Sequence, residues 1–187
     1  TETCPHYLLL SDAEMASKGP LAKIGPPLRA DDGPDREALW RGLELGQTSI
    51  VSSDHAPYPQ ELKQVGWENI FVTPDGVSVP FGSPGVETIV SLMYSEGVVK
   101  RGLPIWWLAR VMSENPARIF GLYPRKGTIQ VGSDADLLIL DPGGDRIITA
   151  KDHQSNAGYS LFEGWSVSGR PWMTLLRGQV LLNQGKL

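Results

Sequence analysis

Apolar and polar positions follow one another in blocks that indicate alternating strands and helices over the first two thirds of the chain. Residues 7–10 form a short apolar run that is compatible with a buried strand, although its length alone does not separate a strand from a helix. Residues 48–53 are rich in β-branched side chains and predict a strand that ends at Asp54. This part of the chain therefore has the pattern of an α/β fold.

Helices are predicted where apolar residues recur one turn apart between start and stop signals. One begins at about Asp35 with an acidic first turn and stops at Gly46. Another has Ser83 as its N-cap and Pro84 in its first turn, and it stops at Gly97. Two further helices are predicted over residues 104–112 and 115–121.

After Tyr123 the period changes from helical to strand-like. Residues 128–131 and 135–140 read as two strands around a turn, and residues 173–176 and 179–182 read as a hairpin around Arg177-Gly178. We therefore predict two domains, an α/β part over residues 1–122 and a β part over residues 123–187.

Composition narrows the function classes. The 187 residues include 17 Lys+Arg against 21 Asp+Glu, for a net charge of -4, which argues against a nucleic-acid partner. No run of about 18 apolar residues predicts a membrane span. The single cysteine, Cys4, excludes an internal disulfide and a zinc site built on cysteines, and it favours a reducing, cytoplasmic setting.

Asp54 is the leading candidate for chemistry. A carboxylate at the carboxyl end of a buried strand lies where α/β barrels keep their catalytic groups, and it can ligate a metal or accept a proton. Position alone leaves open whether Asp54 instead caps a turn. His6 and His55 could also be ligands or hydrogen-bonding structural residues, and His153 lies in a polar loop. The three histidines lack the spacing of a metal-ligand motif, so spacing alone does not support a complete metal site.

Four stretches, in order, resemble the cyclic amidohydrolases of the hydantoinase and dihydropyrimidinase branch, which also takes in dihydroorotase and allantoinase. They are Glu2-Thr3-Cys4-Pro5-His6-Tyr7-Leu8, Pro26-Pro27-Leu28-Arg29, Ser53-Asp54-His55-Ala56-Pro57, and Asn115-Pro116-Ala117-Arg118-Ile119-Phe120-Gly121-Leu122 with its continuation to Leu137. The stretch 159–169 resembles the hydantoinases in particular.

The resemblance implies a (β/α)8 TIM barrel followed by a β-sandwich. The chain would supply the carboxyl-terminal portion of the barrel, with its last two strands ending near Leu10 and Ser53, and part of the sandwich. It does not begin with Met and reads straight into an apolar run. We therefore expect a piece of a longer protein that is inactive as an isolated chain.

The resemblance also implies a divalent metal cofactor, with two zinc ions in each complete site. Of the family's ligands, a His-x-His pair, a carbamylated Lys, two further His and one Asp, only the Asp is matched here, by Asp54. By resemblance, Asp54 ligates one metal and carries a proton from the bridging hydroxide to the leaving amide nitrogen.

Substrate contacts implied by the resemblance fall at main-chain groups of Gly25, Phe81 and Gly82. Phe81 stands where relatives have Asn, so the pocket wall would differ. The expected partner is a small-molecule cyclic amide, a hydantoin or a dihydropyrimidine, and the complete protein is expected to be a homo-oligomer, a tetramer.

Two alternatives stay open. One is a dihydroorotase or allantoinase activity of the same superfamily. The other is a non-catalytic scaffold or assembly protein of the hydantoinase type, and the presence of Asp54 weighs against it.

Overall fold

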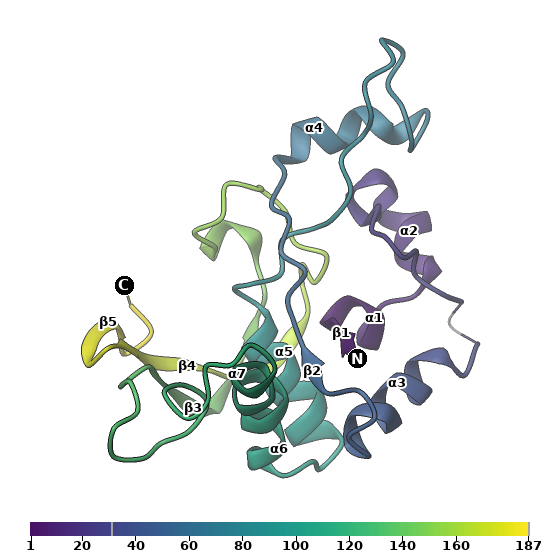
Figure 1. Ribbon diagram of the computed structural model, residues 1–187. Coiled ribbons are helices and arrows are strands. Elements are labelled where there is room, and N and C mark those ends of the chain that lie inside the picture. The colour runs from purple at the N-terminus through teal and green to yellow at the C-terminus, as the bar shows by residue number, and fades with distance from the viewer. Residues whose placement is uncertain (31, 187) are drawn as a thin grey trace.

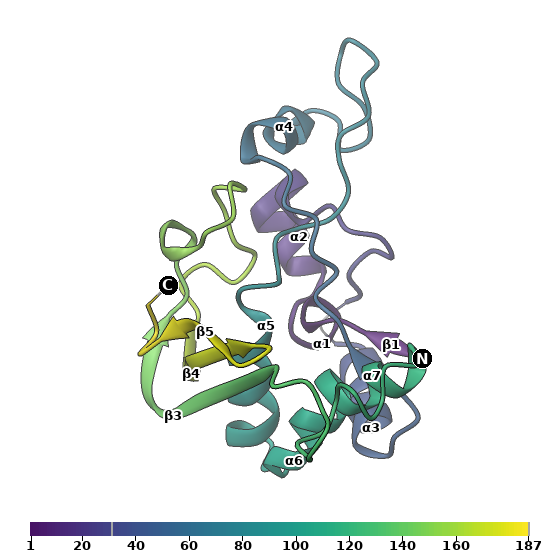
Figure 2. The same cartoon turned by 60° about the vertical axis from the view of Figure 1, so that its left-hand side comes forward.

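The computed structural model describes residues 1–30 and 32–186. Its two β-sheets lie on opposite sides of the molecule (Figures 1 and 2). The smaller sheet pairs β1 (Glu2–Thr3) in parallel with β2 (Ile50–Val51). The larger sheet is antiparallel in the order β3-β4-β5.

Between β1 and β2 the described residues form three α-helices, with a 3-10 turn at Gly19–Ala22 after the second. They are α1 (Pro5–Leu9), α2 (Asp12–Lys18) and α3 (Asp35–Glu44). Helix α2 begins with a capping box, in which the Ser11 hydroxyl accepts from the helix and the Glu14 carboxylate accepts from the Ser11 amide. Because parallel strands need a crossover connection, these helices are what allows β1 and β2 to lie side by side.

The first element differs from its prediction. Residues 7–9 belong to helix α1, and the strand before them is only Glu2–Thr3, so the first strand does not end near Leu10. Pro5 occupies the first helical turn, where its fixed φ favours a helix. The second strand likewise ends at Val51 rather than at Ser53.

A second group of helices follows β2 along the chain. Helix α4 (Gln60–Gln64) is followed by a loop that projects from the molecule in both views. Helix α5 (Ile89–Met93) continues as a π-helical segment over Tyr94–Lys100. Helix α6 (Ile105–Ala109), a π-helical segment over Arg110–Glu114 and α7 (Asn115–Ile119) follow one another without interruption.

The predicted limits of the helix after Ser83 are wrong at both ends. Ser83 forms an isolated bridge with His55 instead of a cap, and the regular helix begins at Ile89. Gly97 lies inside the π-helical segment, where a side chain would lie 2.7 Å from the Trp107 ring. Packing against Trp107, rather than helix termination, therefore accounts for this glycine.

The antiparallel sheet contains β3 (Leu137–Ile147), β4 (Ser166–Leu176) and β5 (Gln179–Asn183). The predicted hairpin is confirmed: Arg177 and Gly178 both have positive φ, as a two-residue turn between antiparallel strands requires. The strand predicted over residues 128–131 is absent, and Ile129 and Val131 are exposed there. It has no partner strand among the described residues.

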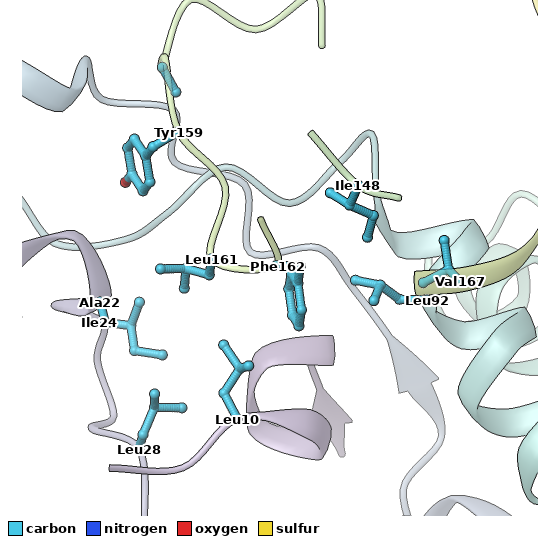
Figure 3. Close-up of a cluster of buried hydrophobic side chains, with 11 residues drawn as sticks. Leu10, Ala22, Ile24, Leu28, Leu92, Ile148, Tyr159, Leu161, Phe162 and Val167 are labelled. Atoms are coloured by element: carbon cyan, nitrogen blue, oxygen red, sulfur yellow. The ribbon is translucent and has the colours of Figure 1, made fainter. Parts of the chain in front are cut away.

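Two apolar clusters form the core. Helices α3, α5 and α6 meet in the first, around Trp40, Leu43, Met93 and Trp107. The second joins the segment after α1 to the region before β4 (Figure 3). Its members are Leu10, Ala22, Ile24, Leu28, Leu92, Ile148, Ala157, Tyr159, Leu161, Phe162 and Val167.

The second cluster takes residues from both sides of position 122, and a domain boundary there stays a prediction. In the part of the chain that the structure covers, no helix is long and apolar enough to cross a membrane.

Candidate active site

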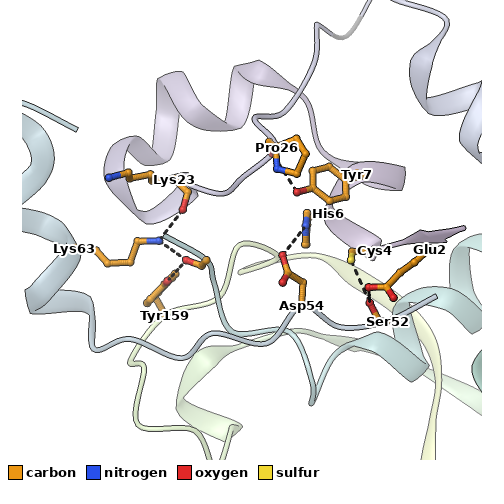
Figure 4. A network of polar contacts seen from close by, with 11 residues as sticks. Glu2, Cys4, His6, Tyr7, Lys23, Pro26, Ser52, Asp54, Lys63 and Tyr159 are labelled. Atoms are coloured by element: carbon orange, nitrogen blue, oxygen red, sulfur yellow. Dashed lines mark hydrogen bonds and ion pairs between the residues drawn. The ribbon is translucent and has the colours of Figure 1, made fainter. Parts of the chain in front are cut away.

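Asp54 lies three residues after the last residue of β2, at the carboxyl end of the parallel pair. Its φ of 47° places it in the left-handed region, and its side chain is 48% exposed. Its carboxylate Oδ2 lies 3.7 Å from Nε2 of His6, which is at the start of α1 (Figure 4). The parallel pairing therefore brings together two groups that are far apart in the sequence.

His6 Nε2 is a buried nitrogen without a hydrogen-bond partner among the described residues. The residue is 3% exposed, and burial lowers the pKa of its imidazole to about 4, although the Asp54 charge opposes this shift. The ring is therefore neutral near pH 7. Because buried polar atoms are normally satisfied, this nitrogen has the character of a ligand or of a donor awaiting an acceptor.

Cys4 completes a cluster with these two residues. One ligand atom from each of Cys4, His6 and Asp54 lies within 4.8 Å of the others. The Cys4 thiol contacts the Ser52 hydroxyl at 3.4 Å, and burial raises its pKa to about 11. The thiol is thus protonated at neutral pH, which leaves the imidazole and the carboxylate as the groups ready to bind a cation.

Tyr7 lies on the other side of His6. Its ring meets the His6 ring edge-on at 4.2 Å, and its hydroxyl donates to the Pro26 carbonyl at 3.1 Å. Burial, followed by the charge of Asp54, raises the pKa of the phenol to about 12. Tyr7 therefore stays neutral and links the Asp54 region to the segment that contains Gly25.

His55 has a structural role. Its Nδ1 accepts from the amides of Gly85 and Val86 at 3.1 and 3.3 Å, and its main chain bridges to Ser83. The histidine next to Asp54 in the sequence thus fixes the following loop, whereas the distant His6 faces the carboxylate. Spacing along the chain did not reveal this pair, because it depends on the register of the two strands.

Gly25, Phe81 and Gly82 lie close together. A side chain on Gly25 would lie 3.4 Å from the Phe81 ring, which is 52% exposed. Gly82 donates its amide to the Lys23 carbonyl at 2.9 Å, and a side chain there would lie 2.4 Å from the Ala56 Cβ. The loop 79–85 therefore packs directly against the residues that follow Asp54. Substrate binding by these three residues stays a prediction.

Two lysines behind this loop are buried, and nothing in the sequence indicated their burial. Lys63 is fully buried and Lys23 is 3% exposed, and both donate to main-chain carbonyls. Lys63 lies in a largely polar stretch, whereas Lys23 lies between the apolar residues Ala22 and Ile24. Sequence reasoning assigns both to the surface, because a lysine is rarely fully buried.

The donor set of the cluster fits a divalent metal such as zinc. Imidazole nitrogen and carboxylate oxygen are ligands that zinc takes, and catalytic zinc sites combine them. The unpartnered, buried Nε2 of His6 beside the Asp54 carboxylate is the observation that supports the fit.

Comparison with known proteins finds relatives that are named hydantoinase, allantoinase and dihydroorotase. It is 39% identical to the L-hydantoinase of Paenarthrobacter aurescens, over 100% of this chain and 39% of that protein. It is 37% identical to an allantoinase of Rubrobacter xylanophilus, over 100% of this chain and 38% of that protein. A dihydroorotase of Thermus aquaticus is 34% identical, over 96% of this chain and 39% of that protein.

The structure agrees with these relatives. It superposes on the D-hydantoinase (dihydropyrimidinase) from Thermus sp. with a TM-score of 0.91 and 34% identity, over 100% of this chain and 40% of that one. This likeness confirms the fold class expected from the sequence. The chain spans about 40% of the length of the relatives that it matches.

A family model agrees with the relatives on where the chain belongs. The model described as the amidohydrolase family matches residues 26–181, a range that includes Asp54 and the loop 79–85. The chain therefore belongs to the amidohydrolase family.

Proposed function

We propose that the protein containing this chain hydrolyses the ring amide of hydantoins or dihydropyrimidines, with Asp54 as its proton-transfer residue and as a metal ligand. The observation that supports this most directly is the Asp54 carboxylate at the end of a parallel strand, 3.7 Å from a buried, unpartnered imidazole nitrogen. The names of the matching relatives supply the substrate class.

Asp54 is suited to move a proton. Its carboxylate is half exposed, so an oxygen atom is free to accept a proton from an attacking water and to pass it to the ring nitrogen as the amide bond breaks. His6 lies on its buried side as a neutral ring, 3.7 Å from the carboxylate and without a hydrogen bond to it. The positive φ of Asp54 aims the side chain away from the strand.

The metal would be held by Asp54, with His6 next to it. When bound, a divalent ion such as zinc makes hydroxide available near neutral pH and polarises the carbonyl that is attacked. The use of two zinc ions and a tetrameric assembly remain parts of the proposal that rest on the resemblance to the family. The cytoplasmic location rests on the single cysteine, Cys4.

Gly25, Phe81 and Gly82 form the proposed substrate wall. Main-chain groups of Gly25 and Phe81 can pair with the ring amide, since such groups are indifferent to the side chains around them. The Gly82 amide already donates to the Lys23 carbonyl, so Gly82 contributes to the shape of the wall. The exposed face of Phe81 adds an apolar surface, which favours a ring substituent that is apolar. Hydantoins with an aromatic or branched substituent are therefore the first substrates to test.

The experiment uses the product of the complete reading frame that contains these residues. Its metal content is measured by elemental analysis, and its hydrolysis of a hydantoin with an aromatic substituent, unsubstituted hydantoin, dihydrouracil, allantoin and dihydroorotate is followed separately. The D54N variant should lose both metal and turnover. The matched control is D75N, because Asp75 is an exposed carboxylate in the projecting loop.

Each outcome has a distinct meaning. Metal and turnover that survive in D54N would contradict the role of Asp54. Turnover of allantoin or dihydroorotate alone would select the alternative enzymes. A wild-type protein with neither metal nor turnover would favour the non-catalytic scaffold.

A further inference from the structure

Lys63 is a buried cation without a carboxylate. It lies in α4 and is fully buried, yet no ion pair among the described residues includes it. Its ammonium instead donates to three main-chain carbonyls, those of Leu21, Lys23 and Gly82. The first two bonds measure 3.1 and 3.2 Å. Figure 4 shows the bond to Lys23.

The three carbonyls come from two separate segments. Leu21 and Lys23 precede Gly25, and Gly82 follows Phe81. The ammonium therefore bridges the two sides of the proposed substrate wall. An ammonium group has three N–H donors, and the three carbonyls provide one acceptor for each.

Gly82 is held at both of its main-chain groups. Its amide donates to the Lys23 carbonyl at 2.9 Å, and its carbonyl accepts from Lys63 and, at 3.5 Å, from the hydroxyl of Tyr159. Lys23 makes a second connection between the same two segments, which we call the second tether beside that of Lys63. Its ammonium donates to the Val79 carbonyl and lies 4.1 Å from the Phe81 ring centre.

Packing alone does not explain a lysine here. Burying an ammonium is costly unless its hydrogen bonds are made, and an apolar residue of the same length would fill the space without that cost. Burial, reinforced by the charge of Lys23, lowers the pKa of Lys63 to about 8. Unlike an apolar residue, the Lys63 ammonium connects the segment before Gly25 to the loop 79–85.

We infer that Lys63 is a positioning residue of the substrate wall, which fixes Gly82 and Phe81 against Gly25 without touching the substrate. The inference rests on the proposed function. It predicts that loss of the ammonium loosens the loop 79–85 and weakens substrate binding, while the chemistry at Asp54 proceeds as before.

The test compares K63M with the wild type, using the product of the complete reading frame. Methionine keeps the length and apolar stem of lysine but removes all three donors. K151M is the matched control, because Lys151 is exposed. Amide hydrogen exchange at Gly82 and Ala56 is measured together with kcat and KM for hydantoin.

In K63M the exchange protection at Gly82 should fall about 10- to 100-fold, since hydrogen bonds from a charged donor are lost. Amides of β4 should keep theirs. KM should rise about tenfold with little change in kcat, the signature of lost uniform binding. K151M should match the wild type in both measurements.

Other outcomes would overturn the inference. Unchanged protection at Gly82 would show that the tether is not needed, and increased exchange with an unchanged KM would show that it does not position the site. If K63M does not fold, K23M removes the second tether, and the same two measurements decide. A wild type that hydrolyses no cyclic amide would instead refute the proposed function, and the inference with it.

Discussion

Replacing Gly82 by alanine tests how closely the loop 79–85 must approach the residues after Asp54. Gly82 has a φ of 95°, and a Cβ at this position would lie 2.4 Å from the Cβ of Ala56. Carbon atoms prefer a separation of about 3.5–4.0 Å, so the two segments would have to move apart by about 1 Å or more. Ala56 lies two residues beyond Asp54 and donates its amide to the Ser83 carbonyl.

The expected cost has two parts. An L-residue at positive φ costs about 1–2 kcal/mol. Forcing a methyl group into a packed contact costs about 1–3 kcal/mol more. We therefore expect G82A to lower the free energy of unfolding by about 2–5 kcal/mol.

G76A separates the two parts. Gly76 has a similar φ of 79°, and no atom outside its immediate neighbours lies within 4 Å of its Cβ position. It should therefore show only the conformational cost. Urea unfolding of the wild type and both variants, followed by tryptophan fluorescence, gives the difference. If G82A and G76A are equally destabilised, the close approach of Gly82 to Ala56 is refuted.

Three further predictions concern the core and the ionisable groups near Asp54. W107A should lower the free energy of unfolding in urea by about 3–5 kcal/mol, since Trp107 is 1% exposed and packs on Trp40 and Gly97; a loss below 1 kcal/mol would contradict its place in the core. Because burial lowers the pKa of His6 to about 4, the folded state binds fewer protons than the unfolded state between about pH 4 and 6.5. The free energy of unfolding should therefore fall as the pH drops through this window, by roughly 3 kcal/mol in total, and H6Q should remove most of that slope. The Cys4 thiol, whose pKa is raised to about 11, should react with a disulfide reagent at pH 8 far more slowly than free cysteine; a rate equal to that of free cysteine would show that it is accessible and ionised.

Local signals in the sequence predicted the elements that depend on local chemistry. Helix α3 begins at Asp35 as its acidic start indicated, and the hairpin after β4 turns at Arg177-Gly178. By contrast, the short apolar run at residues 7–9 forms a helix, because Pro5 occupies the first turn of α1. The strand before this helix, β1, is only two residues long. The exposed stretch 128–131 shows that strand propensity without a partner strand does not produce a strand.

The candidate site was predictable only in part, for the same reason. Asp54 was identified from its place after a buried strand. Its approach to His6 depends on the register of β1 against β2, which no spacing in the sequence encodes. Lys63 was missed because a lysine in a polar stretch is assigned to the surface, and only the three converging carbonyls account for its burial.

The brevity of the parallel strands has a consequence for how the site forms during folding. Each strand contributes two residues, so few hydrogen bonds offset the entropy of closing the long connection between them. The helices and the hairpin make local contacts and are expected to form earlier. Asp54 should therefore meet His6 only when the first apolar cluster assembles, because that cluster contains Leu8 of α1 and Val51 of β2. Substitutions deep in that cluster would then delay the appearance of the site in refolding, even though they lie far from the carboxylate.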